Sequence, residues 1–154
     1  MPQLVKGGKH VYGWSKVGDS GRIAVPPEAI KEYHFNNPTK VFLMTASKRS
    51  GGFGLTTKQL LMNSQLSVVL EKNPELASFH LPEAKTTKIG TKLYCWTTMD
   101  ANGCIRVPLE TLQDYGISAG DRLLVGRGSG LALAFIIKGP IIEEAKKHSE
   151  LTTF

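Results

Sequence analysis

Apolar and polar residues alternate in several short stretches of the chain, as is typical of β-strands with one buried face. The clearest stretches are residues 10–17 and 92–99, which are rich in Val, Tyr, Trp and Thr, the residues favoured on a pleated surface. On the first of them, Tyr12, Trp14 and Lys16 are expected to share one side. Further strands are predicted at residues 22–25, 40–46, 54–57, 104–107, 122–126 and 131–138. The pattern therefore predicts a mainly β fold.

Glycine-containing turns separate the first two strands in each half of the chain. Residues 18–21 read GDSG and residues 100–103 read DANG, and glycine supplies the positive φ that such turns need. Each half is therefore expected to open with a hairpin. Pro26 and Pro108 end the second strand, because proline cannot donate to a ladder but suits the first turn of a helix. We expect short helices over residues 27–33 and 109–115.

One segment of 22 residues occurs twice. Residues 12–33 align with residues 94–115 without a gap, at a constant offset of 82, and eight of the 22 positions are identical. Both tryptophans of the chain fall on equivalent positions. Self-similarity at a fixed offset indicates two copies of one supersecondary unit, which we interpret as β-β-α-β-β, in residues 1–58 and 91–139. A unit of about 50 residues buries too little surface alone, so we expect one shared core that contains the Tyr12/Trp14 and Tyr94/Trp96 strands.

The remaining residues form a connector and a C-terminal extension. Residues 59–90 are the connector, predicted to be a helix followed by a linker. Met62, Leu66 and Val69 recur at helical spacing, with Thr56 or Thr57 available as the cap, although residues 66–70 fit a strand equally well. Residues 140–154 are predicted to form a helix, over 141–148, and a tail. We interpret that helix as a packing or dimer surface.

The repeated unit resembles the AbrB/SpoVT superfamily of swapped-hairpin proteins, which includes MraZ-type regulators and MazE-type antitoxins. The matching runs are GRIAVPPEAIKEYHF (21–35) and GCIRVPLETLQDYGISAGDRLLV (103–125), and the most specific piece is GISAGD (116–121). In that family two copies interlock into one barrel, and the usual activity is DNA binding in bacterial and archaeal gene regulation. The resemblance implies a swapped-hairpin β-barrel with short helices and a sequence-specific DNA-binding transcriptional regulator.

Positive charge is concentrated in the first copy. The formal net charge is +6, and residues 1–60 hold nine Lys and Arg against three acids. Residues 61–90 hold three of each sign, and residues 91–154 hold seven of each. The whole excess therefore belongs to the first copy, as expected for a face that binds a polyanion. A basic surface that binds nothing acidic is the alternative.

The resemblance places the candidate DNA contacts near the first hairpin turn and in the short helix. Arg22 follows that turn and is the expected base reader, because a guanidinium can grip guanine with two hydrogen bonds. Lys16 and Lys31 are expected to contact phosphates, with assistance from Lys6 and Lys9. The matching positions of the second copy are uncharged: Thr98, Cys104 and Gln113. We therefore expect one basic face and one neutral face in each chain.

Recognition of a two-fold operator needs two equivalent reading faces. A chain with one such face is expected to form a homodimer or a higher homo-oligomer on double-stranded DNA. The alternative is an interaction or sensory module that retains the barrel without DNA contact.

Other classes of function find little support in the sequence. The four histidines are scattered outside any catalytic or metal-binding motif, so we expect neither an enzyme nor a metal or cofactor site. Cys104 is expected opposite Met99 rather than Cys95, which disfavours a disulfide. The longest apolar run, residues 131–137, is far shorter than the ~20 residues needed to span a bilayer. A cytoplasmic protein is expected.

Overall fold

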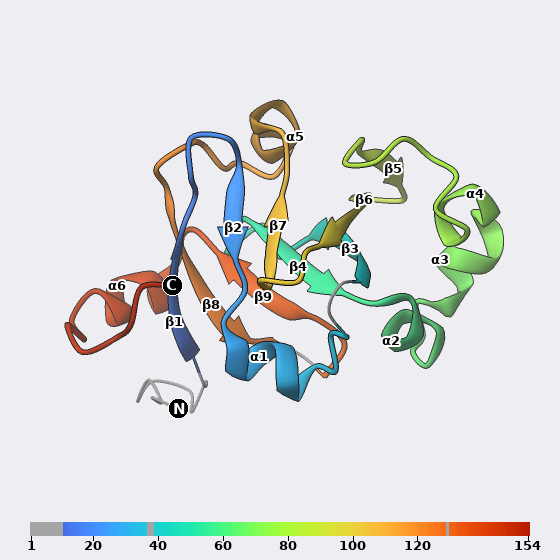
Figure 1. The fold of residues 1–154 in the computed structure, drawn as a ribbon. Helices are drawn as coiled ribbons and strands as arrows, with labels where there is room; N and C mark the ends of the chain where they lie inside the picture. The colour runs from blue at the N-terminus through green and yellow to red at the C-terminus, as the bar shows by residue number, and fades with distance from the viewer. Residues whose placement is uncertain (1–10, 37–38, 129) are drawn as a thin grey trace.

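The computed structural model describes residues 11–36, 39–128 and 130–154 as a mainly β structure with short helices. Nine strands form one antiparallel sheet in the order β1-β8-β9-β4-β3-β6-β7-β2, and β5 pairs with β6 off this path (Figure 1). The strands are β1 (Val11–Lys16), β2 (Arg22–Ala24), β3 (Thr39–Thr45), β4 (Phe53–Thr56), β5 (Thr87–Ile89), β6 (Lys92–Met99), β7 (Cys104–Arg106), β8 (Arg122–Arg127) and β9 (Leu133–Ile136). The helices are α1 (Pro27–Glu32), α2 (Lys58–Met62), α3 (Ser67–Lys72), α4 (Pro74–Ala77), α5 (Leu109–Asp114) and α6 (Pro140–Ala145).

The sheet curls into a nearly closed barrel. Its two terminal strands, β1 and β2, are consecutive in the chain and are joined by a turn in which Gly18 N donates to Arg22 O at 2.9 Å. The turn glycine Gly21 has a φ of +81°, and a Cβ there would lie 1.8 Å from Val107 O. Only glycine therefore lets the first copy approach the second at this crossing.

The strands of the two copies pair with one another. In β1 and β8, Trp14 lies opposite Leu124, and in β6 and β3 the equivalent Trp96 lies opposite Phe42. The two pairs are equivalent under the repeat, because Trp96 lies 82 residues after Trp14 and Leu124 lies 82 residues after Phe42. In the ladder of β2 with β7, Ile23 lies opposite its own equivalent, Ile105. The two copies are thus related by an approximate two-fold axis through this ladder.

The expected hairpins form only at their turns. The ladder partner of β2 is β7 of the other copy rather than β1. Strands β6 and β7 meet at a single pair, in which Met99 faces Ile105 and not Cys104 as the sequence suggested. The expectation failed because the longest ladders here join residues far apart in sequence, which local turn signals do not specify.

The interior of the barrel, here the barrel core, is lined by apolar side chains from both copies. It includes Val25, Leu43, Leu55, Ile105 and Phe135. The expectation that Tyr12 and Trp14 share one side is wrong. The register of β1 shifts between Val11 and Gly13, so Tyr12 points into the barrel core while Trp14 points outward. A β-bulge of this kind reverses the alternation of side chains.

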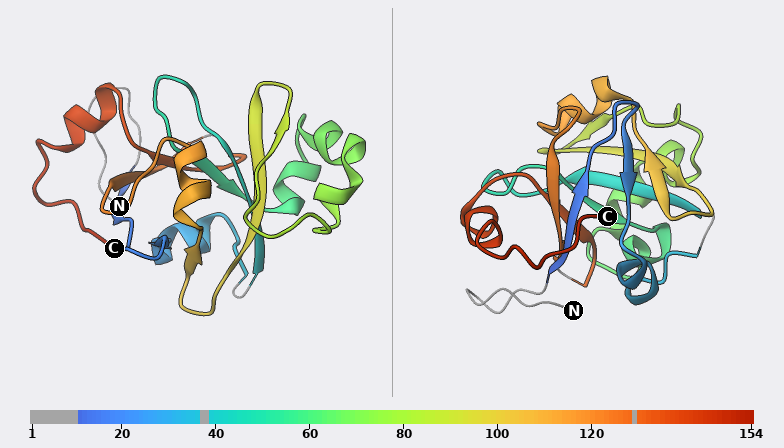
Figure 2. Two further views of the ribbon diagram at one scale, coloured as in Figure 1. Left: turned by 90° about the horizontal axis from the view of Figure 1, so that it is seen from above. Right: turned by 60° about the vertical axis from the view of Figure 1, so that its left-hand side comes forward.

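Two layers cover the outside of the barrel at opposite ends (Figure 2). At one end, α6 packs on Trp14, with Ile142 and Ala145 buried against it. At the other end, α2–α4 cover the side of β3 and β6 that carries Tyr94 and Trp96. Tyr94 and Trp96 therefore share one side, and that side faces the connector and not, as expected, the barrel core.

The connector departs from the predicted single helix. Thr57 caps α2, accepting a hydrogen bond from Leu60 N at 3.2 Å, but the helix ends at Met62. Ser64 then donates to Leu61 O and accepts from Leu66 N, and such local side-chain bonds compete with helix continuation. Residues 67–72 form α3, and part of the expected linker forms α4 and β5. None of the helices among the described residues is long and apolar enough to cross a membrane.

Candidate nucleic-acid interface

Two arginines lie side by side on the outer face of the ladder formed by β2 and β7. Arg22 is the direct cross-strand partner of Arg106, and both side chains are exposed. Ile23 and Ile105, the next pair in the ladder, point into the barrel core. Side chains directly opposite in an antiparallel pair have Cβ atoms about 4.5–5.5 Å apart. The ladder therefore presents two exposed arginines directly opposite each other, which we call the arginine pair.

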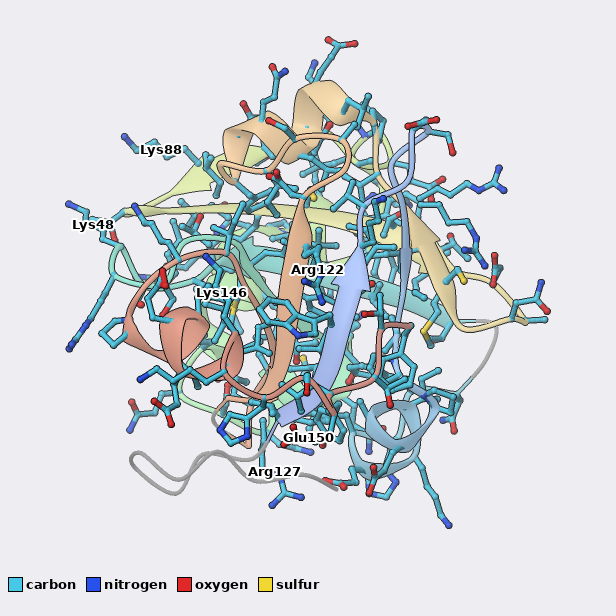
Figure 3. All side chains as sticks on the ribbon, turned by 90° about the vertical axis from the view of Figure 1, so that its left-hand side faces the viewer. Lys48, Lys88, Arg122, Arg127, Lys146 and Glu150 are labelled. Atoms are coloured by element: carbon cyan, nitrogen blue, oxygen red, sulfur yellow. The ribbon has the colours of Figure 1, made fainter. Side chains whose placement is uncertain are left out.

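A second pair of cations lies at the end of β1. Lys16 is the cross-strand partner of Arg122 in β8. The guanidinium of Arg122 lies 4.5 Å from the centre of the Trp14 ring, and its Nη2 donates to Thr153 Oγ1 at 3.5 Å (Figure 3). Both residues are exposed, and Arg122 is in addition held in place by its contact with Trp14.

The remaining predicted site residues are less closely placed. Lys31 is exposed on α1, a helix that begins after Pro26 and buries Ala29 toward the barrel core. Lys6 and Lys9 lie outside the described residues. The structure therefore places Arg22 and Lys16 each beside a second cation, while Lys31 lies on a separate element.

Within the described part of the chain, neither arginine of the arginine pair forms an ion pair with a carboxylate. Among the described residues, no ion pair includes Arg22, Arg106, Lys16 or Lys31. The carboxylate of Glu32, on the same helix as Lys31, instead forms an ion pair with Arg127.

Glu32 also accepts a hydrogen bond from Tyr12 Oη at 2.8 Å. Burial, together with this bond, raises the pKa of Tyr12 above its ordinary value. This network joins the end of α1 to the start of β1 and to β8, and it occupies the carboxylate of Glu32.

Sequence reasoning missed the contribution of the second copy to this surface. Arg106 and Arg122 belong to the copy with balanced charge, yet they lie beside Arg22 and Lys16. The structure therefore does not separate one basic face from one neutral face, because cations of both copies lie side by side. The repeat makes Ile23 and Ile105 equivalent residues. A two-fold axis between these two residues places Arg106 opposite Arg22, so the repeat contained the signal that could have revealed this pair.

Metal-ligating side chains do not gather in the described part of the chain. No group of three or more His, Cys, Asp and Glu side chains is arranged there to hold a metal ion. Cys95 and Cys104 are both buried free thiols.

The fold defines a mainly β protein with a nearly closed antiparallel barrel. No model of a known protein family matches the chain, and a search of curated proteins finds no match either.

Proposed function

We propose that the chain is a sequence-specific DNA-binding transcriptional regulator of AbrB/SpoVT type, with the swapped-hairpin barrel of that family. The repeated motifs around residues 21–35 and 103–125 support the proposal, and so does the pairing of β1 with β8 and of β3 with β6 between the copies. The observation that carries it is the arginine pair, which is exposed and has no ion-pair partner among the described residues.

The arginine pair suits the reading of base edges. The major groove admits a two-stranded β-ribbon, and arginine binds guanine O6 and N7 with two hydrogen bonds. Two like charges held directly opposite destabilise a ladder, so a phosphate or a base acceptor between Arg22 and Arg106 relieves that repulsion. Lys16 and Lys31 would contact phosphates, each contributing about one unit to the dependence of log K on log salt concentration.

A second chain is part of the proposal. Sequence-specific interfaces bury on the order of 1,000–2,500 Å² of protein surface, which is more than one short ladder provides. We therefore propose that two chains bind together, as a homodimer or a higher homo-oligomer, with one arginine pair on each half-site.

A fluorescence-anisotropy titration tests this function. Duplex DNA from upstream of the protein's own coding region and random-sequence DNA are titrated at two salt concentrations with wild type, Arg22→Ala and Arg106→Ala. Each substitution is expected to cost roughly 1–3 kcal/mol and to relax sequence preference. Lys48→Ala is the control, because Lys48 projects from the side of the molecule away from β2 and β7 (Figure 3).

Two outcomes contradict the proposal. One is an absence of binding by wild type even at low salt, which would favour an interaction or sensory module. The other is a loss in Lys48→Ala as large as that in Arg22→Ala, which would mean that only net charge matters.

A further inference from the structure

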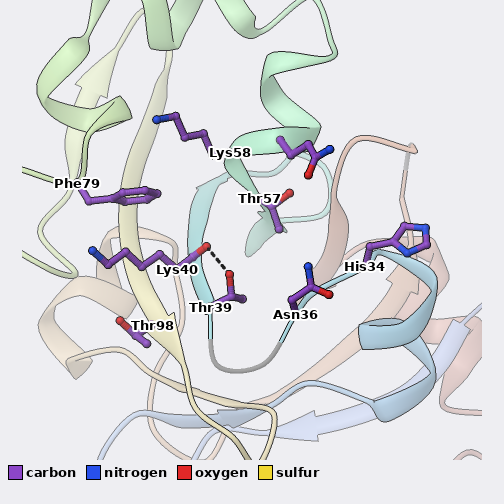
Figure 4. A pocket seen from close by; sticks show the side chains of 9 residues that line it. His34, Asn36, Thr39, Lys40, Thr57, Lys58, Phe79 and Thr98 are labelled. Carbon is purple, nitrogen blue, oxygen red and sulfur yellow. Dashed lines mark hydrogen bonds between the residues drawn. The ribbon is translucent and has the colours of Figure 1, made fainter.

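An open groove of about 550 Å³ lies between the connector and the start of β3. Lys40 and Lys58 project into it from β3 and α2, and their side chains converge on Phe79 (Figure 4). Thr98 lies beside Lys40 as its cross-strand partner, and His34 and Asn36 line the opposite wall. The volume is within the range of small-molecule sites, which is about 300–1,000 Å³.

The polar groups of the groove favour an anion. None of the described lining residues is acidic, and no ion pair within the described part of the chain includes Lys40 or Lys58. Glu83 is a carboxylate close by, but it accepts hydrogen bonds from Thr97 Oγ1 and Thr98 N, each at 3.0 Å. It is thus held on β6 and leaves the two lysines without a counter-charge.

Phe79 supplies an apolar wall between the two lysines. Lys40 Nζ lies 5.1 Å from the centre of its ring, and Lys58 Nζ lies 5.9 Å from it. The ring stacks on Phe42, with centroids 5.1 Å apart and planes 16° apart, and meets Trp96 edge-on at 5.5 Å. The ring is therefore fixed by aromatic packing on one side and flanked by cations.

The backbone at Phe79 adopts the left-handed conformation that often follows the end of a helix. Its φ is +60°, in the left-handed region, directly after the end of α4. Glycine is the usual residue at such a position, because a side chain there is strained. His80 N donates to Glu75 O at 2.9 Å, so this conformation belongs to the C-terminal cap of α4 and fixes the backbone that carries the ring.

We propose that this groove binds a small phosphorylated organic molecule, such as a nucleoside phosphate. The phosphate lies between the ammonium groups of Lys40 and Lys58, and the organic part packs against Phe79. The hydroxyl of Thr98 and the amide of Asn36 provide further hydrogen bonds. This site is separate from the arginine pair and does not depend on DNA binding.

Isothermal titration of the full chain tests the proposal, with ATP and pyrophosphate as probes and adenosine as the uncharged control. Wild type is expected to bind ATP and pyrophosphate but not adenosine alone. Lys40→Met and Lys58→Met should each weaken binding about tenfold, as expected for a lost charge-assisted contact. Lys88→Met removes the same charge from an exposed position on β5 and should leave binding unchanged.

Thr98→Glu provides a second test that leaves both lysines in place. A carboxylate in the groove should abolish binding, while the thermal unfolding midpoint stays near that of wild type. The proposal is overturned if wild type fails to bind either phosphate probe at millimolar concentration, or if Lys88→Met weakens binding as much as Lys40→Met. It is also overturned if the groove variants weaken duplex DNA binding as Arg22→Ala does, while wild type binds no phosphate probe. That result would assign the groove to the DNA surface.

Discussion

Trp14 and Trp96 occupy equivalent positions of the repeat but lie beneath different coverings. The backbone of Trp14 pairs with the C-terminal segment: its N donates to Thr152 O at 2.8 Å, and its O accepts from Phe154 N at 2.7 Å. Together with α6, this segment leaves Trp14 only 4% exposed.

Trp96 lies beneath the connector instead. Its O accepts from Ala84 N at 2.7 Å, and its indole Nε1 donates to Leu81 O at 2.8 Å. Trp96 stays partly exposed at the edge of the groove. Each indole has a cation over it, Arg122 on Trp14 and Lys40 on Trp96, at equivalent positions.

Gly13 and Cys95 are equivalent residues of the repeat, and their side chains help to explain why the two tryptophans are covered differently. Gly13 has a φ of +139°, and a Cβ there would lie 2.3 Å from Thr152 O. The absence of a side chain lets the C-terminal segment approach β1. The equivalent Cys95 points into the barrel core instead. The repeat thus determines the ladders, while single residues and non-repeated segments determine what covers them and where grooves form.

Replacing the tryptophans should produce the largest difference between the two ends. Trp14→Ala is expected to cost about 3–5 kcal/mol, because it empties a buried site and removes the packing of Arg122. Trp96→Ala should cost about 2 kcal/mol, since part of that side chain already contacts solvent. Urea unfolding of both variants measures the two values, and equal losses would mean that both coverings bury their tryptophan to the same extent.

The thiol of Cys95 should add a dependence on pH that the equivalent residue, Gly13, cannot supply. Burial raises the pKa of Cys95 from 9.0 to about 11. Because the folded-state pKa is the higher one, the thiol stabilises the fold below pH 9, and this contribution is lost as the pH rises from 9 to 11. Each pKa unit corresponds to about 1.4 kcal/mol, so the loss is about 2–3 kcal/mol.

The free energy of unfolding of wild type and Cys95→Ala, measured under reducing conditions between about pH 8 and pH 11, checks this contribution. Wild type should lose about 2–3 kcal/mol more than the variant over that range. Parallel curves for the two proteins would contradict the assignment.

The two repeated tyrosines should give the smallest difference. Tyr12→Phe removes the hydrogen bond to Glu32 and should cost about 1 kcal/mol. Tyr94 has no side-chain hydrogen bond among the described residues, so Tyr94→Phe should change stability by less than about 0.5 kcal/mol. Thermal unfolding of the pair measures both effects, and a larger loss in Tyr94→Phe would contradict the network around Glu32.

Local patterns were sufficient to predict most of the barrel elements. The alternating stretches became β1 and β6, and Pro26 and Pro108 precede the short helices α1 and α5, as expected. These signals act within a few residues of one another. The bulge at Gly13 and the strand pairing between copies depend on contacts with residues far away in the sequence, which alternation does not report.

The candidate site was predicted in part. The exposure of Lys16, Arg22 and Lys31 follows from their positions on the outer faces of short elements. The neighbours Arg106 and Arg122 become visible only when the two-fold relation of the copies is applied. The groove was beyond prediction, because it forms where a non-repeated connector packs on the repeated sheet.

The central claim is that the two copies form one barrel, and separate expression of residues 1–74 and 82–154 tests it most directly. Circular dichroism and sedimentation follow each fragment alone and the equimolar mixture. Neither fragment should form a folded monomer, because each lacks the ladder partners of its longest strands. The mixture should recover a folded one-to-one complex. Two fragments that each fold independently as monomers would contradict the account.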